Sequence, residues 1–273
     1  MELTLPDMLA FRFLGVGNAR ALELGSSSGV LEHGGEPLLL IDCGPDTLAT
    51  YARCYGQPLP PAIFITHAHL DHIGGLEGLF YQAYTENYGC GCIRLYIPVK
   101  LVETVQKRIA DYPEILAEGG ANFWDAFQLI PVTDGFWHQN RRFTVFPVRH
   151  HAVYSAYGLA LEGGFLYTGD TRPIPEILNQ YACRGETILH DCGLRQNPSH
   201  TGVYELATHY RPEQLCRLVL YHYDSPQAGD ELEKLGYRVA RPQQRLLLPP
   251  QRHSSLEAAD VILDFETRRF GRA

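Results

Sequence analysis

Three histidines and one aspartate crowd into six residues of the chain. The segment reads His67-Ala68-His69-Leu70-Asp71-His72. Neutral imidazole nitrogens and carboxylate oxygens are ligands that zinc and other first-row ions accept. His67 and His69 are expected to project together from an extended turn, while the adjacent Asp71 and His72 can point toward different ions. A histidine-rich surface turn would not explain this charge density directly after an apolar strand, so we predict a metal-binding segment.

Further metal-type side chains stand where later strands are predicted to end. Loops at strand ends can turn side chains from several strands toward one place, so we expect these residues to join the first cluster. None of them interrupts an apolar core pattern. They are His150 and His151 after the strand at 143–148, Asp170 after 165–168, and His222 after 218–221.

The pattern of apolar runs and turns predicts an α/β protein with mixed sheets. Strands are expected at 11–15, 28–31, 37–42, 62–66, 94–97, 143–148, 156–161, 165–168, 187–191, 217–221 and 237–240. Helices are expected at 46–55, 75–83, 100–109, 203–210 and 256–267. Residues 110–137 predict irregular structure with aromatic packing. Because no linker divides the chain, we expect one domain over residues 1–273.

The composition is that of an ordinary globular protein. The 273 residues are 45% hydrophobic and 20% charged, which indicates neither disorder nor a fibrous repeat. The net charge of −8 lacks the basic balance of proteins that grip duplex nucleic acid, so we do not expect a long nucleic-acid partner. No apolar run is long enough to span a membrane, and Met1 to Leu14 lack a secretory pattern. We therefore predict a cytoplasmic protein with no membrane partner.

The cysteines favour the same compartment. Seven cysteines, odd in number and scattered, indicate reduced thiols rather than a disulfide framework. Cys90-Gly91-Cys92 is one residue short of a CxxC pair and has no second pair beside it. We interpret it as a turn with two free thiols rather than as a metal or redox site.

Taken together, these residues resemble the metallo-β-lactamase superfamily. The resemblance rests on His67-x-His69-x-Asp71-His72, a later histidine, Gly169-Asp170-Thr171 and a final His222, and it spans residues 11–225. It implies a four-layer αβ/βα sandwich with two mixed β-sheets and a two-metal site at one edge. Asp170 stands where the β-lactamases of this superfamily have a cysteine, which disfavours lactam hydrolysis.

The resemblance also implies a set of metal ligands. One ion would be bound by His67, His69 and the histidine at 150 or 151, and the other by Asp71, His72 and His222, with Asp170 bridging both. The strand exit at 146–150 favours His150, whereas the spacing to Gly158 favours His151. Two divalent ions are implied, with Zn2+ favoured and Mn2+ or iron as alternatives.

Within the superfamily, the sequence is most similar to the branch of tRNA 3′-processing endonucleases and phosphonate-pathway cyclic phosphodiesterases. The similar segments are 13–19, 26–29, 40–44 and 190–192, followed by His200-Thr201. In that branch the histidine corresponding to His200 assists catalysis as a proton donor. The chain departs from the tRNA enzymes because only 19 residues lie between His150 and Asp170, which leaves no room for their exosite arm. The stretch 84–140 matches no known specificity loop.

We therefore predict a metal-dependent hydrolase that uses a hydroxide shared by two metal ions, and more specifically a phosphodiesterase for a small or cyclic, nucleotide-like phosphodiester. Asp71 would orient the nucleophile and His200 would protonate the departing alkoxide, unless His200 is only a loop residue bonded to backbone. The expected partner is a small-molecule substrate, and a homodimer is compatible with the sequence. The alternatives are a hydrolase of thioesters, lactones or other carboxyl esters, and a non-hydrolytic metal-binding or redox di-metal protein.

Three weaker signals lie near the predicted ligands. Asp42 and Asp191 could accept ring protons from ligand imidazoles, or could cap local turns. The loop 15–18 contains two glycines and could offer backbone N–H groups to a phosphate, or form a tight turn. Three tyrosines could line a pocket or pack as ordinary aromatic residues; they are Tyr154, Tyr157 and Tyr223.

Overall fold

The computed structural model describes residues 8–85, 93–110 and 123–250. The predicted turn at Cys90-Cys92 and the predicted helix at 256–267 lie outside these residues. The described strands form two seven-stranded sheets, and both sheets are mixed. Among the described residues, no helix combines the length and the apolar character needed to cross a membrane.

The first sheet combines an antiparallel half with a parallel half. Its strand order is β14-β1-β2-β3-β4-β5-β6, antiparallel from β14 to β3 and parallel from β3 to β6. The strands are β1 (Leu9–Gly15), β2 (Ser28–His33), β3 (Glu36–Ile41), β4 (Ala62–Phe64), β5 (Ile93–Pro98), β6 (Phe127–Val132) and β14 (Arg245–Leu247). The parallel half directs the carboxyl ends of β3 and β4 toward the same edge.

The second sheet repeats this plan. Its order is β13-β12-β11-β10-β9-β8-β7, antiparallel from β7 to β10 and parallel from β10 to β13. The strands are β7 (Gly135–His138), β8 (Arg141–Pro147), β9 (Tyr157–Leu161), β10 (Phe165–Tyr167), β11 (Thr187–Asp191), β12 (Leu218–Tyr221) and β13 (Arg238–Val239).

The core lies between the two sheets. Phe11 of β1 is fully buried, and its ring centroid lies 5.6 Å from that of Phe165 and 5.8 Å from that of Tyr167, both on β10. At the other end, Phe136 of β7 stacks on Tyr96 of β5 at 4.0 Å. These rings join residues of opposite sheets, so the inner faces pack directly on each other.

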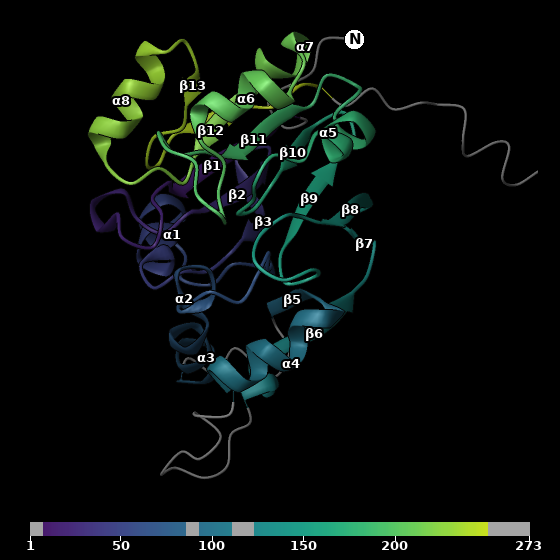
Figure 1. Cartoon of the computed structure of the whole chain (residues 1–273). Helices are drawn as coiled ribbons and strands as arrows, with labels where there is room; N and C mark the ends of the chain where they lie inside the picture. The colour runs from purple at the N-terminus through teal and green to yellow at the C-terminus, as the bar shows by residue number, and fades with distance from the viewer. Residues whose placement is uncertain (1–7, 86–92, 111–122, 251–273) are drawn as a thin grey trace, which may run out of the picture.

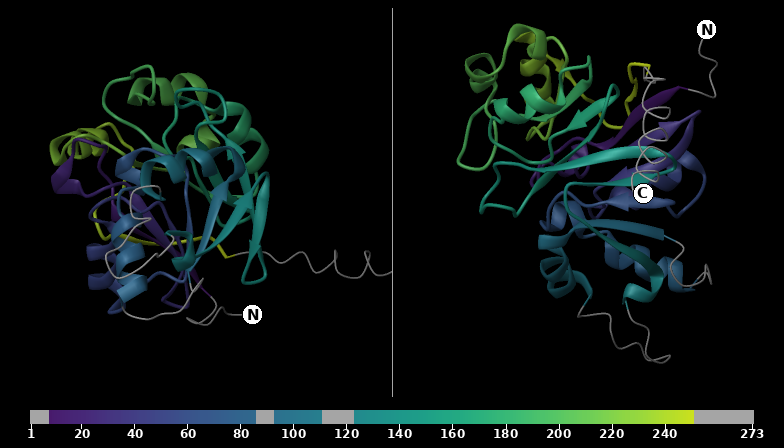
Figure 2. Two further views of the ribbon diagram at one scale, coloured as in Figure 1. Left: turned by 90° about the horizontal axis from the view of Figure 1, so that it is seen from below. Right: turned by 90° about the vertical axis from the view of Figure 1, so that its right-hand side faces the viewer.

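Helices cover the outer faces of the sandwich (Figures 1 and 2). Beside the first sheet lie α1 (Thr47–Tyr55), α2 (Leu70–Ile73), α3 (Leu76–Thr85) and α4 (Val102–Val105). Beside the second sheet lie α5 (Pro175–Tyr181), α6 (Val203–His209), α7 (Pro212–Leu215) and α8 (Pro226–Lys234). Short turns of other helix types are η2 (Leu22–Leu24), η3 (Val99–Leu101), η4 (Gln106–Ala110) and η5 (Phe123–Ala126). The predicted α/β class with two mixed sheets and flanking helices is confirmed.

The prediction of irregular structure over 110–137 is wrong where the structure describes it. Residues 127–132 form β6 and residues 135–138 form β7, so this part of the stretch 84–140 supplies an edge strand to each sheet. The single helix predicted at 100–109 is instead η3, α4 and η4 in succession, the last a π-type turn. Edge strands are half-exposed, and Pro131 interrupts the strand pattern of β6, which explains why apolar periodicity failed to find it.

Helix α8 was also missed, although the sequence carries a signal for it. Ser225 accepts a hydrogen bond on its side chain from the N–H of Ala228, and Pro226 occupies the first turn. A serine followed by proline is a typical helix start. The buried residues of α8 are Ala228, Gly229 and Leu232, and only the last is a large apolar residue, so the apolar pattern did not mark the helix.

Candidate active site

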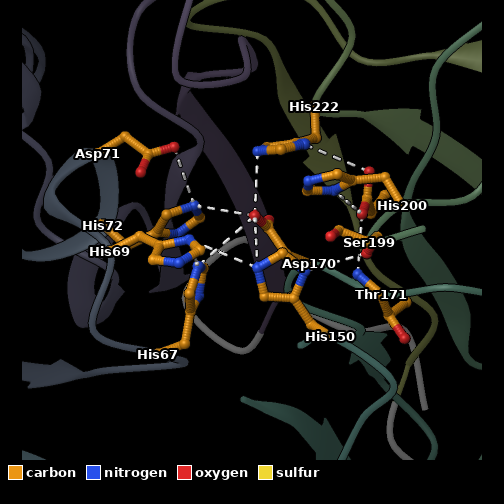
Figure 3. A network of polar contacts seen from close by, with 12 residues as sticks. His67, His69, Asp71, His72, His150, Asp170, Thr171, Ser199, His200 and His222 are labelled. Carbon is orange, nitrogen blue, oxygen red and sulfur yellow. Dashed lines mark hydrogen bonds and ion pairs between the residues drawn. The ribbon is translucent and has the colours of Figure 1, made fainter. Parts of the chain in front are cut away.

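The predicted metal-type side chains of both sheets meet around one oxygen atom, as Figure 3 shows. Asp170 Oδ2 lies 3.2 Å from His222 Nε2, 3.4 Å from His72 Nε2, 3.6 Å from His67 Nε2 and 4.0 Å from His150 Nε2. All five side chains are almost completely buried. The strand ends of β4, β8, β10 and β12 therefore meet at one edge of the sandwich.

Three groups of donor atoms lie around Asp170, and the third of them is Asp170, Asp191, His200 and His222, whose donor atoms lie within 4.8 Å of one another. In the first, His69 Nδ1 lies 3.1 Å from His67 Nε2 and 3.4 Å from His150 Nε2. In the second, an oxygen of Asp71 lies 3.5 Å from His72 Nε2. The donor atoms of His67, His69, His150 and Asp170 lie within 4.8 Å of one another, and so do those of Asp71, His72 and His222.

Hydrogen bonds on the far side of two imidazoles fix which nitrogen faces the site. The Thr66 hydroxyl donates to Asp42 Oδ2 at 2.7 Å, so its oxygen is left to accept from His67 Nδ1 at 3.1 Å. His150 Nδ1 donates to the carbonyl of Ser199 at 3.0 Å. Each ring is thereby left with an unprotonated Nε2 directed at the cluster.

Buried carboxylates orient the other two imidazoles. Asp42 Oδ2 accepts from His72 Nδ1 at 2.8 Å, and Asp191 Oδ1 lies 3.3 Å from His222 Nδ1. Both aspartates also accept from a backbone N–H group, Asp42 from Thr66 and Asp191 from Thr171, each at 2.8 Å, so the two predicted roles coexist. On the inner side, His72 Nε2, His222 Nε2 and Asp170 Oδ1 are buried without a hydrogen-bond partner among the described residues.

The backbone bends sharply to present these groups. Asp42 and His222 have φ of 61° and 70°, a left-handed conformation that costs about 1–3 kcal/mol for residues other than glycine. His222 is held there because its N–H donates to the Val16 carbonyl at 2.7 Å. Gly169 also has positive φ, 63°, and a Cβ there would lie 2.8 Å from the Tyr157 carbonyl. Position 169, directly before Asp170, therefore requires glycine.

The electrostatics of the site favour metal-binding protonation states for several groups. Burial lowers the pKa of His150 to about 4 and that of His67 well below its usual value, so both rings are neutral at pH 7. Burial raises the pKa of Asp170, but the surrounding imidazoles outweigh it and hold that pKa well below its usual range. Asp170 is consequently a carboxylate.

The chemistry and spacing of these residues fit divalent metal binding. A tetrahedral ion bound at about 2.0–2.1 Å spaces its ligand atoms about 3.3 Å apart, close to the 3.1 and 3.4 Å between the imidazole nitrogens of the first group. One proton on His69 Nδ1 can satisfy only one of its two neighbouring nitrogens, whereas a cation between the three would accept a lone pair from each. The unpartnered inner atoms of His72, His222 and Asp170 are explained in the same way.

The structure separates His150 from His151. His150 points into the cluster, whereas His151 is exposed and has a left-handed φ of 52°. Its ring centroid lies 5.0 Å from that of His69, on the outer side. Of the two, only His150 has its donor atom in the group around Asp170.

His200 lies at the rim of the cluster. Its Nδ1 donates to Asp191 Oδ2 at 2.8 Å, and its ring stacks on that of His222 at 4.8 Å between centroids. Burial lowers the pKa of His200, but the hydrogen bond and charge of Asp191 outweigh it and raise the pKa to about 9. His200 is therefore charged at pH 7 and bonded to a carboxylate, rather than to backbone as in the alternative prediction.

The other weak signals have structural explanations. The N–H groups of Val16, Gly17 and Asn18 all donate to backbone carbonyls, so this loop does not offer them to a phosphate. Instead, the loop holds the turn at His222, because the Val16 carbonyl accepts from the His222 N–H. Tyr157 and Tyr223 are buried in the core, and Tyr154 is exposed outside the cavity.

A cavity of about 860 Å³ opens onto the cluster. Its inner end is formed by His69, Asp71, Asp170, His200 and His222. Its outer walls are polar side chains that sequence reasoning did not identify, namely Asn18, Arg20, Arg195, Gln196, Asn197 and Gln227. The orienting roles of Thr66 and Ser199 were missed as well; Thr66 directly precedes the motif, but no sequence signal marks the Ser199 carbonyl.

The fold and this site together define a hydrolase of the metallo-β-lactamase fold. The metallo-β-lactamase fold protein YhfI from Bacillus subtilis superposes with a TM-score of 0.68 at 16% identity, over 88% of this chain and 100% of the other. A diphosphatase from the PhnP family superposes with a TM-score of 0.69 at 20% identity, over 88% and 99%.

Sequence comparison narrows the class to one family. The family model described as Anti-Pycsar protein Apyc1 matches residues 9–246. The Anti-Pycsar protein Apyc1 of Paenibacillus harenae is 30% identical over 249 residues, which cover 86% of this chain and 98% of that protein. The chain belongs to the Anti-Pycsar protein Apyc1 family.

The role of Asp42 can be tested with the substitution Asp42→Asn. An amide directs N–H groups where His72 Nδ1 now donates, so the imidazole should lose its orientation and Zn2+ affinity should fall about 10- to 100-fold. Competition with a chromophoric chelator measures this. Asp134→Asn, at a side chain 87% exposed, is the control. Unchanged Zn2+ affinity in Asp42→Asn would contradict the orienting role.

Proposed function

We propose that the chain is a metal-dependent phosphodiesterase that hydrolyses a small or cyclic, nucleotide-like phosphodiester. The observation that carries the proposal is the position of Asp170 at the inner end of the cavity, where its Oδ2 lies within 4.0 Å of histidine nitrogens of the first two donor groups, beside His200. Membership of the Apyc1 family and the similarity in fold to a PhnP-family diphosphatase support phosphate chemistry over carboxyl-ester chemistry.

The geometry favours the following assignment of ligands. His67, His69 and His150 would bind one ion, Asp71, His72 and His222 would bind the other, and Asp170 would bridge both. The three imidazoles of the first group favour Zn2+, and Mn2+ or iron would be accepted by the same donors.

When bound, the cations would supply positive charge that lowers the pKa of a water molecule and balances charge on the phosphoryl oxygens. The protein supplies orientation and a proton. Asp71, partly exposed to the cavity, would accept a hydrogen bond from the attacking water and direct its lone pair at phosphorus. His200, held by Asp191, would donate its Nε2 proton to the departing alkoxide.

Metal removal and a substrate panel test the proposed function. Protein stripped by a chelator should lose hydrolysis of nucleoside cyclic phosphates and of bis(p-nitrophenyl) phosphate, and Zn2+ or Mn2+ should restore it. Mass spectrometry should find two divalent ions per chain in the active form. Hydrolysis of a thioester or lactone panel, with no hydrolysis of any phosphodiester by the metal-loaded protein, would overturn the proposal in favour of carboxyl-ester chemistry.

Substitution of Asp71 tests its double role. Asp71→Ala removes one metal ligand and the group that orients the water, so kcat for the phosphodiester should fall by more than about 100-fold. Steady-state kinetics with metal in excess measure it, with Asp134→Ala as the matched aspartate control. A kcat within a few-fold of the wild type would exclude Asp71 from the reaction.

The proton-donor role of His200 predicts a selective loss. His200→Ala should lower kcat by about 100- to 10,000-fold for substrates with a poor alkoxide leaving group. The effect should be much smaller for p-nitrophenyl esters, whose leaving group departs without a proton. His209→Ala, at an exposed position on α6, is the control. Equal losses on both kinds of substrate would show that His200 is not the donor.

A further inference from the structure

Strand β11 runs further toward the site than its neighbour β10. The last register pair of these two parallel strands is Tyr167 with Leu189. Beyond it, the chain after β10 turns at Gly169, which has a left-handed φ, to present Asp170. β11 continues to Asp191. The backbone N–H and C=O of Asp191 that a longer β10 would have bonded therefore need other partners.

Side chains take the place of the missing strand. The Thr168 hydroxyl oxygen accepts from the Asp191 N–H at 3.1 Å. The Asp191 carbonyl oxygen lies 2.6 Å from His190 Nδ1. Because a carbonyl oxygen can only accept, the proton of this bond is on His190 Nδ1. The backbone of Asp191 is thus held by two neighbouring side chains, at the point where its carboxylate bonds to His200.

The other nitrogen of the His190 ring is bonded as well. Its Nε2 lies 2.6 Å from the Tyr210 hydroxyl, which accepts from the Ile174 N–H at 2.9 Å. Burial lowers the pKa of His190, so the ring is neutral and carries its one proton on Nδ1. Nε2 therefore accepts the proton of the Tyr210 hydroxyl. These bonds fix both the tautomer and the orientation of the ring.

This network joins three segments that carry residues of the site. Ile174 precedes α5 and belongs to the segment that follows Asp170. Tyr210 follows α6, the helix that begins shortly after His200. His190 lies on β11, between these two segments. Because successive side chains of a strand point to opposite faces, His190 acts from the outer, helix-covered face of the sheet (Figure 1).

We propose that His190, bonded to Tyr210, is a positioning residue that holds Asp191 where its carboxylate can orient His200 and His222. The inference rests on the proposed function, because it assigns proton donation to His200. His190 is fully buried and lies outside the lining of the cavity, so it acts through Asp191. An apolar pair of the same shape would fill this space without any polar group to satisfy. The bonds at both ring nitrogens point to orientation rather than to packing alone.

Two substitutions of nearly equal size test this role. His190→Asn keeps an N–H donor close to the position of Nδ1, whereas His190→Leu has none. With metal in excess, His190→Leu should lower kcat about 10- to 100-fold for substrates with a poor alkoxide leaving group, and much less for p-nitrophenyl esters. His190→Asn should recover most of this loss. Tyr210→Phe removes only the hydroxyl and should lower kcat in the same selective way.

Proton NMR of the metal-free protein gives a readout that does not depend on activity. The Nδ1 proton of His200, bonded to Asp191 at 2.8 Å, should resonate downfield of the amide protons. This resonance should shift upfield or vanish in His190→Leu and remain in His190→Asn. Tyr51→Phe, which removes a buried hydroxyl on α1, is the control and should change neither kcat nor the resonance.

Three results would overturn the positioning role. They are an unchanged His200 resonance in His190→Leu, equal losses of kcat on the two kinds of substrate, and a loss in His190→Asn as large as in His190→Leu. If His190→Leu fails to fold, Tyr210→Phe provides both readouts. If the metal-loaded wild type cleaves neither kind of substrate, the proposed function fails instead, and the NMR resonance alone decides the role of His190.

Discussion

The structure depends on one buried carboxylate oxygen that is surrounded by imidazole nitrogens. Asp170 Oδ2 lies between 3.2 and 4.0 Å from four histidine side chains, and two of these nitrogens, His72 Nε2 and His222 Nε2, have no hydrogen-bond partner among the described residues. Such an arrangement is unfavourable without positive charge at its centre. It persists because each ring is held from behind by a group that is itself buried. These groups are the Thr66 hydroxyl, the carboxylates of Asp42 and Asp191, and the Ser199 carbonyl.

Neither sheet could form this arrangement alone. The turn after β4 and helix α2 carry the first cluster, while His150, Asp170 and His222 follow strands of the second sheet. The distances between donor atoms are therefore set by how the sheets pack, through contacts such as Phe11 with Phe165 and Tyr167. Close packing in such an interior permits little adjustment. The packing of the core between the sheets therefore sets the spacing of the donor atoms at the edge.

One segment of the chain links the wall of the cavity to the ring of His200. Residues 193–200 begin with part of this wall and end with His200, whose ring is fixed by Asp191. A ligand group in contact with Arg195 would lie at a fixed distance from His200, because a hydrogen bond closes the base of this segment. Orientation of this kind lowers the entropic barrier to reaction.

The sequence alone was sufficient for the fold class and for the residues that converge around Asp170, because buried strands appear as apolar runs and the histidines of the cluster stand where those runs end. It could not find β6 and β7, whose half-exposed edge positions lack a clear period, and it left His150 and His151 unresolved because adjacent residues share the same strand exit. Only tertiary structure decided that His150 turns inward, that Asp42 and Asp191 contact the rings of His72 and His222, and that Arg195, Tyr204 and Glu231 meet at a cavity. Those contacts join residues far apart in the chain, and the packing of the two sheets, rather than any local pattern, brings them together.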